Sequence, residues 1–340
     1  MDKVFVHGFP GLYGGAGAEL YHQIPVWQAL GLEVHLIPTR NGWQVDPIYP
    51  ELKKSGVVVH STNQFDAIDK GAPVLGFCSQ DFLRALDFIR ARTEATVFVN
   101  CMTWLFAEER QRMSKGHIRA FLYQNEDVRK ARAPELRALN RSARCKFMTF
   151  VPYFDQKKFP FIEGRTSAHF GLGRMSRQDQ DKYAGNTLFI YEHVMSQRPK
   201  VGLFVGFTDK LRMKVGQPAP WIITAKDHRE CSQQAFYKHC EIVLQPTDTT
   251  ENWPRVGLEA MSSGSVLVVD DRGGWQRMIQ HKKTGFLCRS AQDFVFYASL
   301  MAYEPDLRAE IARAARKRGE DLASMDESKQ TWKACLEAVV

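Results

Sequence analysis

The feature that most constrains the fold is the regular alternation of short apolar runs with amphipathic segments of helical length along the whole chain. This alternation is typical of a parallel sheet covered by helices. It pauses at Pro152 to Asp155, where proline and aromatic residues indicate a linker, and then restarts. A length of 340 residues suits two domains of about 150 residues each. We therefore expect an α/β protein with two Rossmann-like domains that face each other across a cleft.

The apolar runs predict the strands of each domain. In the first half they lie near Val4–His7, Glu33–Pro38, Val57–His60, Pro73–Phe77, Thr96–Asn100, Ile118–Tyr123 and Phe147–Val151. In the second half they lie near Ala168–Gly171, Val201–Val205, Trp221–Thr224, Ile242–Gln245 and Val266–Asp270. Helices are expected over 17–30, over 80–92 and from about 291 onward. We expect an N-terminal domain over 1–152, a C-terminal domain over 165–318 and a helix over 319–340 that packs back on the first domain.

Other classes of protein are disfavoured by what the chain lacks. It opens with one apolar run of strand length, shorter than a signal sequence requires, and no stretch approaches about 18 apolar residues. Its seven cysteines are scattered and never form C-x-x-C, so neither a disulfide framework nor a zinc site is indicated. We expect a cytoplasmic protein.

A glycine-rich run, Gly14-Gly15-Ala16-Gly17, follows the first expected strand and opens a helix. Such glycines let backbone amides approach a phosphate or a sugar, although a tight turn with close helix packing explains them equally well. The run does not match G-x-G-x-x-G, and the second strand ends without an acidic residue, at Ile37 to Arg40. A nicotinamide-dependent dehydrogenase is therefore disfavoured.

Two carboxylates stand out where an expected strand ends at Gln245. Glu251 lies in the loop that follows, and Glu259 lies inside a helix expected to begin near Pro254. Carboxylates accept paired hydrogen bonds from vicinal hydroxyls, and the amides at a helix start can meet a phosphate. Glu259 is surrounded by apolar residues, and a buried acid needs a partner. This spacing therefore indicates a site for a sugar or a ribose, with chance as the alternative.

The residues after this pair carry a resemblance to a known family. They comprise a small-residue turn, an apolar strand, a glycine pair and a further Thr-Gly: Ser262-Ser263-Gly264, Val266-Leu267-Val268-Val269, Gly273-Gly274 and Thr284-Gly285-Phe286-Leu287. In this order the sequence resembles the family-4-like retaining glycosyltransferases of the GT-B fold, whose hallmark is Glu, seven residues, Glu. The opening glycine loop with Glu19, and Gly173-Arg174 after the linker, match the same family.

The resemblance implies how a nucleotide-sugar donor is held. It assigns the ribose to Glu259 and the donor sugar to Glu251, and it places an Arg and a Lys of the second domain on the diphosphate. The family's Lys position holds Asp179 here, so we carry these roles to Arg177 and Lys182, with Arg174 as a structural partner. The expected catalytic residues are Glu251, Arg177 and Lys182. The expected donor-binding residues are Gly14, Gly15, Arg174, Asn252, Trp253, Arg255 and Glu259.

The donor chemistry expected from the resemblance is retaining transfer from a nucleoside-diphosphate sugar, with a UDP-hexose such as UDP-glucose as the first candidate. The loop residues Asn252 to Arg255 differ from the family's Gly-Phe-Gly and leave the sugar open. Asp179-Gln180-Asp181 has the D-x-D spacing of a metal motif but lies in a polar stretch away from a strand end. We therefore expect no essential metal and no cofactor. A nucleotide-sugar-binding GT-B protein without transferase activity is the alternative from another class.

A basic segment is relevant to the identity of the acceptor. Residues 110–146 hold eleven Lys or Arg against three acids, an excess equal to the net charge of +8 of the whole chain. Pro134 is expected to begin a helix on which Arg137, Arg141 and Arg144 share a face. This segment is either a solvated surface or a site for an anionic partner.

The resemblance implies that the first domain holds the acceptor, so the anionic candidates are DNA with hydroxymethylated bases and a membrane surface that carries a lipid-linked acceptor. A soluble glycan also remains open. Besides the three arginines, the candidate acceptor-side residues are His7, His60 and Asn100, at the carboxyl ends of expected strands. The oligomeric state is not predicted.

Overall fold

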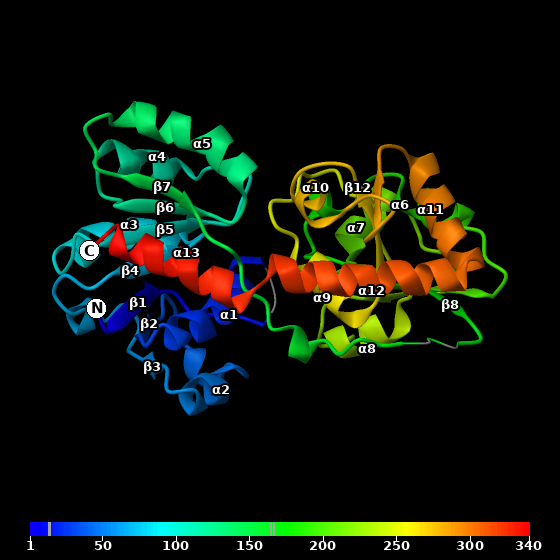
Figure 1. Cartoon of the computed structure of the whole chain (residues 1–340), viewed down its shortest axis with the longest axis horizontal. Helices are drawn as coiled ribbons and strands as arrows, with labels where there is room; N and C mark the ends of the chain where they lie inside the picture. The colour runs from blue at the N-terminus through cyan, green and yellow to red at the C-terminus, as the bar shows by residue number, and fades with distance from the viewer. Residues whose placement is uncertain (13–14, 164, 166) are drawn as a thin grey trace. The chain divides into compact units, whose positions relative to one another are not determined.

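The computed structural model describes residues 1–12, 15–163, 165 and 167–340. It divides into two compact units (Figure 1). Unit 1 contains Met1–Phe154 and Ala323–Val340, and unit 2 contains Asp155–Leu322. Within these described ranges, no helix is both long enough and apolar enough to cross a membrane.

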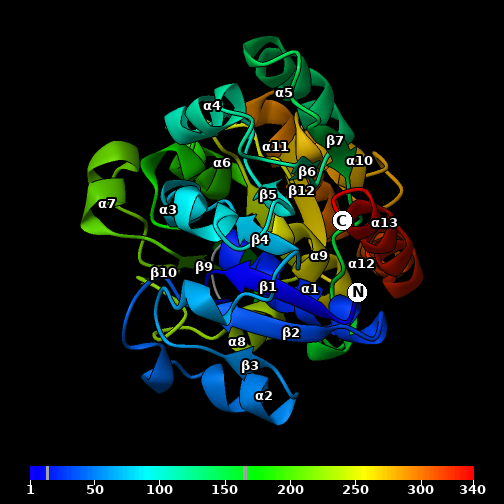
Figure 2. The ribbon, with the colours of Figure 1, turned by 90° about the vertical axis from the view of Figure 1, so that its left-hand side faces the viewer.

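Among the described residues of unit 1, seven strands form one parallel sheet in the order β3-β2-β1-β4-β5-β6-β7. Figure 2 shows them in this order from bottom to top. The strands are β1 (Lys3–His7), β2 (Glu33–Ile37), β3 (Val58–Val59), β4 (Val74–Phe77), β5 (Thr96–Asn100), β6 (Ala120–Tyr123) and β7 (Lys146–Thr149). The expected strands of this half are therefore confirmed, with boundaries that differ by up to two residues.

Helices cover both faces of this sheet because successive strand residues point to opposite sides. Val4 and Val6 pack into one core with Trp27, whereas Phe5 packs into the other with Phe98. The helices are α1 (Gly15–Ala29), α2 (Tyr49–Lys54), α3 (Gln80–Arg90), α4 (Ala107–Ser114), α5 (Glu126–Leu139) and α13 (Met325–Glu337), with short turns η1 (Trp43–Val45) and η2 (Phe65–Ala67).

The C-terminal helix α13 packs on α1 of the same unit. The rings of Trp27 and Trp332 meet edge to face at 5.1 Å, and the indole Nε1 of Trp332 donates to Gln23 Oε1 at 2.7 Å. A buried indole with a satisfied N–H anchors a helix firmly, since it combines a large apolar area with a specific polar contact. Residues 323–340 thus complete the core of unit 1.

The predicted start of helix α5 was wrong. The helix begins at Glu126, where the side chain of Asn125 accepts the amide of Asp127 at 2.8 Å, and Pro134 lies inside it. An Asn cap with two acids in the first turn is a stronger start signal than a proline, because it satisfies free amides and suits the helix dipole. The helix ends at Leu139, so Arg141 and Arg144 lie in the following loop and do not share a helical face with Arg137.

Among the described residues of unit 2, six strands form a second parallel sheet in the order β10-β9-β8-β11-β12-β13. They are β8 (Phe170–Met175), β9 (Lys200–Val205), β10 (Ile222–Ala225), β11 (Ile242–Gln245), β12 (Val266–Asp270) and β13 (Phe286–Cys288). The sequence did not predict β13, and β8 runs four residues further than expected. Gly171 in β8 allows close packing, because a Cβ there would lie 2.0 Å from the carbonyl oxygen of His239.

The helices of unit 2 surround this sheet. They are α6 (Thr187–His193), α7 (Asp209–Val215), α8 (Gln233–His239), α9 (Arg255–Ser263), α10 (Gly274–Met278), α11 (Ala291–Tyr303) and α12 (Pro305–Leu322), with short turns η3 (Gln156–Lys158) and η4 (Gln180–Lys182). Helix α12 lies beside α9, where Arg316 donates to the carbonyl of Ser262 at 2.7 Å. This packing supports the helix that carries Glu259.

Candidate functional site

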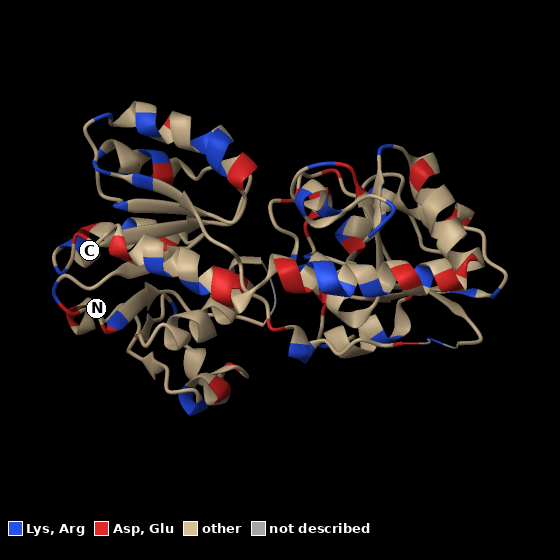
Figure 3. Cartoon of the chain, in the orientation of Figure 1, with Lys and Arg blue, Asp and Glu red and all other residues tan. Residues whose placement is uncertain are grey.

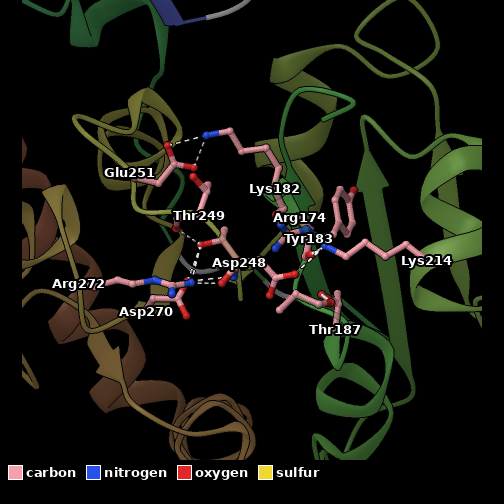
Figure 4. Close-up of polar contacts among 12 residues, drawn as sticks. Arg174, Lys182, Tyr183, Thr187, Lys214, Asp248, Thr249, Glu251, Asp270 and Arg272 are labelled. Atoms are coloured by element: carbon pink, nitrogen blue, oxygen red, sulfur yellow. Dashed lines mark hydrogen bonds and ion pairs between the residues drawn. The ribbon is translucent and has the colours of Figure 1, made fainter. Parts of the chain in front are cut away.

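The carboxyl ends of β8, β11 and β12 bring a charged cluster together in unit 2 (Figure 4). We call it the strand-end cluster and define it as Arg174, Lys182, Glu251, Asp270 and Arg272. Carboxyl ends of adjacent parallel strands meet at one edge of a sheet, which is where open α/β folds bind ligands. Its members therefore share an edge although almost a hundred residues of sequence separate the first from the last.

Glu251 and Lys182 form the centre of the cluster. The ammonium of Lys182, at the end of η4, donates to Oε1 and Oε2 of Glu251 at 2.8 and 2.9 Å. The two side chains are only 14% and 19% exposed. An ion pair that is largely removed from water is stronger electrostatically than a surface pair, and it fixes the positions of both groups.

Arg174 contacts the backbone of Lys182. It is fully buried near the end of β8, and its guanidinium lies over the ring of Tyr183 at 4.0 Å from the centroid. One of its nitrogens donates to the backbone carbonyl of Lys182. Within the described part of the chain its Nε and Nη1 atoms have no hydrogen-bond partner. The site therefore holds a second positive charge, which also acts electrostatically on the carboxyl of Asp270.

Asp270 and Arg272 hold the loop that leads to Glu251. Oδ2 of Asp270 accepts from the amide and the hydroxyl of Thr247 at 2.9 and 2.7 Å, and Arg272 donates to the Thr247 carbonyl. Burial raises the pKa of the Asp270 carboxyl above its ordinary value. Sequence reasoning did not single out these two residues, although Asp270 was expected to end a strand, and that position is the signal that could have identified it.

Lys214 ties the loop to the segment that carries Lys182. Its ammonium, on α7, contacts Asp248 at 2.6 Å and the carbonyls of Gln180 and Tyr183 at 2.7 and 2.6 Å. Because one cation bridges η4 and the β11–α9 loop, both sides of the Lys182–Glu251 pair are held in place (Figure 4). Sequence reasoning did not identify Lys214.

The glycine pair packs against the backbone of Glu251. Gly273 has a positive φ of 58°, and a Cβ there would lie 2.5 Å from the carbonyl oxygen of Glu251. That same carbonyl accepts the amide of Gly274 at 2.7 Å. A side chain at Gly273 would push the loop away, so the glycine pair is needed to set the position of Glu251.

Glu259 lies in the second turn of α9 and is buried. Its Oε2 accepts the hydroxyl of Tyr237 at 2.8 Å, and the positive charge of Arg255 lies close enough to stabilise the carboxylate. Burial nevertheless raises the pKa of this carboxyl, since a charged group loses hydration there. The expectation that Glu259 is buried with a partner is confirmed. Of the loop residues, Asn252 and Arg255 are also buried, and Trp253 is partly exposed.

The structure does not bring every expected donor residue into the cluster. Arg177 is exposed and pairs with Asp179 at 3.1 Å. Gly15 opens α1 in unit 1, and Gly14 lies outside the described residues. Across the described ranges, no group of three or more His, Cys, Asp or Glu could hold a metal ion. Asp179 contributes to an ion pair instead.

Unit 1 has a polar cavity of its own, about 370 Å³ in volume, at the carboxyl ends of β1 and β4. His7, Gly17, Ser79 and Arg84 are among its lining residues. The imidazole Nε2 of His7 lies 2.8 Å from Oδ1 of Asn63 and must carry the proton, because that oxygen only accepts. Burial lowers the pKa of His7, which favours the neutral ring.

The other two strand-end candidates of unit 1 are engaged elsewhere. His60 stacks on His35, with 2.9 Å between His60 Nε2 and His35 Nδ1, and it does not line the cavity. Asn100 donates to Glu109 at 2.9 Å and to the carbonyl of Trp104 at 3.2 Å. These contacts shape the loop after β5. Of the three residues, the structure therefore places only His7 at the cavity.

The three candidate arginines lie at the opposite edge of the sheet. Arg137 is in the last turn of α5, and Arg141 and Arg144 are in the loop that enters β7. Because all strands of unit 1 are parallel, this loop lies at their amino ends, whereas His7 lies at a carboxyl end. The structure therefore separates these arginines from the cavity.

Comparison with known proteins agrees with the two-sheet architecture. Residues 231–318, which include Glu251 and Glu259, match the family described as glycosyl transferases group 1. No curated protein sequence matches the chain.

Several solved structures have the same fold along the full chain. Anabaena Alr3699/HepE, in complex with UDP and glucose, has a TM-score of 0.76 at 15% identity and covers 99% of this chain and 100% of its own. Staphylococcus aureus TarM, as a mutant in complex with Fondaparinux, alpha-GlcNAc-glycerol and UDP, has a TM-score of 0.75 at 10% identity, with 99% and 100% covered. A glycosyltransferase from Rickettsia africae has a TM-score of 0.71 at 14% identity, with 99% and 98% covered. The chain therefore has the GT-B fold of glycosyltransferases, and its residues 231–318 match the glycosyl transferases group 1 family model.

Proposed function

We propose that this protein is a retaining glycosyltransferase that moves a hexose from a UDP-hexose, with UDP-glucose as the first candidate, to an acceptor hydroxyl. The observation that carries this proposal is the Lys182–Glu251 ion pair beside buried Arg174, with Glu251 on the loop that leads into the helix that holds Glu259. The fold is shared with Anabaena Alr3699/HepE, a protein solved in complex with UDP-glucose, which supports the choice of donor.

In this proposal each group of unit 2 has one role. Glu259 accepts hydrogen bonds from the ribose hydroxyls, and Glu251 with the nearby backbone amides contacts the donor sugar. Lys182 neutralises the diphosphate, and Arg174 takes the role that the sequence assigned to Arg177, because its guanidinium lies beside Lys182. Asn252, Trp253 and Arg255 line the same loop and helix start and bind the donor with them.

The transfer breaks the bond between the anomeric carbon and the diphosphate oxygen and forms a bond from that carbon to the acceptor oxygen. In the same-face mechanism, the acceptor proton passes to a phosphate oxygen of the leaving group. Negative charge grows on the diphosphate during this step, and fixed cations at that position lower the barrier. Because Lys182 and Arg174 supply positive charge there, we propose that no metal ion is required.

The acceptor is proposed to bind in the cavity of unit 1, which neutral His7 lines. The candidate acceptors are a hydroxymethylated base in DNA, a lipid-linked glycan at an anionic membrane surface, and a soluble glycan. All seven cysteines are free thiols, which fits a reducing compartment such as the cytoplasm.

The test begins with the donor. A panel of nucleotide sugars is screened by thermal shift, because a ligand that binds only the folded protein raises its melting temperature. Hydrolysis of the best donor is then measured without acceptor, in the presence and absence of EDTA, and proton NMR of the released sugar gives the configuration at its anomeric centre. Absence of any stabilising nucleotide sugar, or wild-type hydrolysis in both Glu251→Ala and Glu259→Ala, would refute the proposed function. An inverted product would refute retention alone.

A further inference from the structure

Six cations gather where the chain enters the last two strands of the unit 1 sheet. We call them the amino-edge basic patch: Lys115, Arg119, Arg137, Arg141, Arg144 and Lys146. They come from the α4–β6 loop, the end of α5, the loop before β7 and the first residue of β7. The two loops lie together, since Nδ2 of Asn140 donates to the carbonyl of Ser114 at 3.0 Å. Figure 3 shows blue Lys and Arg positions on these loops.

Protein groups balance little of the charge of this patch. In the described ranges none of the six cations has an ion pair, whereas other basic residues of the segment do, such as Arg110 with Glu135 at 2.6 Å. One acid of a neighbouring element, Asp87, acts electrostatically on Lys115, but it already holds another cation. Asp87 pairs with Arg112 at 2.9 Å, and Glu94 pairs with Arg90 at 2.7 Å. Residues 136–149 contain no acid at all. Five of the six cations are exposed and Arg119 is half-buried, so the patch presents at least five positive charges to solvent.

The patch lies away from the cavity in which the acceptor hydroxyl is proposed to react. Strands β6 and β7 are each four residues long, so their two ends lie roughly 10 Å apart at about 3.3 Å per residue. The cavity with His7 lies at the carboxyl ends, and the patch lies at the amino ends. A group in contact with the patch is thus not at the reacting hydroxyl, which points to docking of a large partner.

The composition of the patch discriminates between two anionic partners. A bilayer surface is bound by cations combined with apolar or aromatic side chains that enter the lipid. Within residues 107–149, all of them described, Leu139 is the only large apolar side chain that is exposed. Trp104, which is 51% exposed, follows β5 at the carboxyl edge and is not part of the patch. Four of the six cations are arginines, whose planar guanidinium matches phosphate with paired hydrogen bonds.

We propose that the amino-edge basic patch docks a soluble phosphodiester polymer of the nucleic acid type, which presents its reactive hydroxyls at the other edge of the sheet. The inference rests on the proposed function, because it names the class of acceptor for that reaction. Contacts to phosphates dominate the affinity, and they release counterions from the polymer. Binding is therefore independent of base sequence and depends steeply on salt.

The test uses a variant of four exposed cations whose side chains make no hydrogen bond or ion pair with the described residues, K115Q/R141Q/R144Q/K146Q. Its matched control is K53Q/K54Q/K282Q/K283Q, which removes the same charge from exposed positions elsewhere. Binding of a fluorescein-labelled DNA duplex is measured by anisotropy over a salt series. The patch variant is expected to bind at least tenfold more weakly at low salt, with a salt slope smaller by roughly three to four, because each lost phosphate contact contributes about 0.9. The control is expected to bind like the wild type.

Other outcomes overturn the inference. The first is absence of duplex binding by the wild type, and the second is an equal loss of duplex binding in the patch variant and the control. The third is a patch variant that loses binding only to vesicles of phosphatidylcholine with phosphatidylglycerol, which would assign the patch to a bilayer. Thermal shift by the donor and donor hydrolysis are measured in parallel and are expected to be unchanged in the patch variant. If the wild type binds duplex through the patch but no nucleotide sugar, the proposed function fails while the docking surface stands.

Discussion

Replacement of Lys182 by methionine tests the centre of the strand-end cluster. The change removes the ammonium that lies 2.8 and 2.9 Å from the two oxygens of Glu251 and keeps most of the apolar side chain. Two unit charges at 2.8 Å attract by about 1.5 kcal/mol at the dielectric constant of water and by about 6 kcal/mol at an effective value of 20. The cost of removing both groups from water offsets part of this attraction, so we expect a net coupling of about 1–3 kcal/mol between them.

The expected functional effect is larger than this coupling. If Lys182 stabilises the departing diphosphate, Lys182→Met lowers the turnover of donor hydrolysis by about 10²–10³, the usual effect of removing one group that stabilises a transition-state charge. Hydrolysis is the suitable assay because it requires no acceptor. Lys238→Met is the matched control, since Lys238 is an exposed lysine on α8. It is expected to retain wild-type turnover.

A double-mutant cycle with Glu251→Gln separates a shared role from two independent ones. When two interacting residues are both replaced, the double variant loses less activity than the product of the two single losses. The difference, expressed as a free energy, is the coupling energy. We therefore expect Glu251→Gln to cost less in the Lys182→Met background than in the wild type. Wild-type hydrolysis by Lys182→Met, or single effects that simply multiply in the double variant, would refute this reasoning.

Three further predictions concern other residues. Glu259→Gln is expected to weaken UDP binding, measured by calorimetry, by tenfold or more. The variant should lose no stability near pH 8, because burial raises the pKa of this carboxyl and makes its charged form costly. Strong destabilisation would contradict this prediction. Burial raises the pKa of Glu109 to about 7 from an ordinary 4.5, so the folded protein binds this proton more tightly than the unfolded chain, and stability should fall by about 3 kcal/mol from pH 4.5 to 7 and then level off. Urea denaturation of wild type and Glu109→Gln over this range checks it, since the variant should lack this slope. Gly273→Ala is expected to lower donor hydrolysis more than tenfold, because the new Cβ clashes with the backbone of Glu251. The control is Gly56→Ala, which is also at a positive φ but has open space around it. It should lose about 1 kcal/mol of stability and keep wild-type activity.

The parts of the fold that the sequence predicted are those set by local patterns. Strands such as Thr96–Asn100, Ile242–Gln245 and Val266–Asp270 have the predicted bounds, because continuous apolar runs between polar turns define buried parallel strands well. The burial of Glu259 followed from its apolar neighbours in the same way. Strand β13, with three residues between Gly285 and Arg289, is too short for its pattern to be recognised.

The parts that the sequence did not predict depend on contacts between distant segments. Lys214 joins the site through the carbonyls of Gln180 and Tyr183 and the carboxylate of Asp248. None of these partners is near it in sequence. Asn140 likewise brings together two loops whose cations form one patch. In the absence of an observed contact, a charge on a helix or a loop looks like any solvated residue.

The positions of Arg174 and Lys182 show how the chain can bring together two cations that are not adjacent in sequence. Eight positions separate the two residues, and the segment between them leaves the end of β8 at Met175 and returns through η4. Asp179 and Arg177 lie on this segment, where they are exposed and pair with each other. The carbonyl of Lys182 is held by Arg174, and its ammonium reaches Glu251. The geometry at the strand ends therefore brings Lys182 beside Arg174, a contact that a fixed count along the sequence would not have predicted.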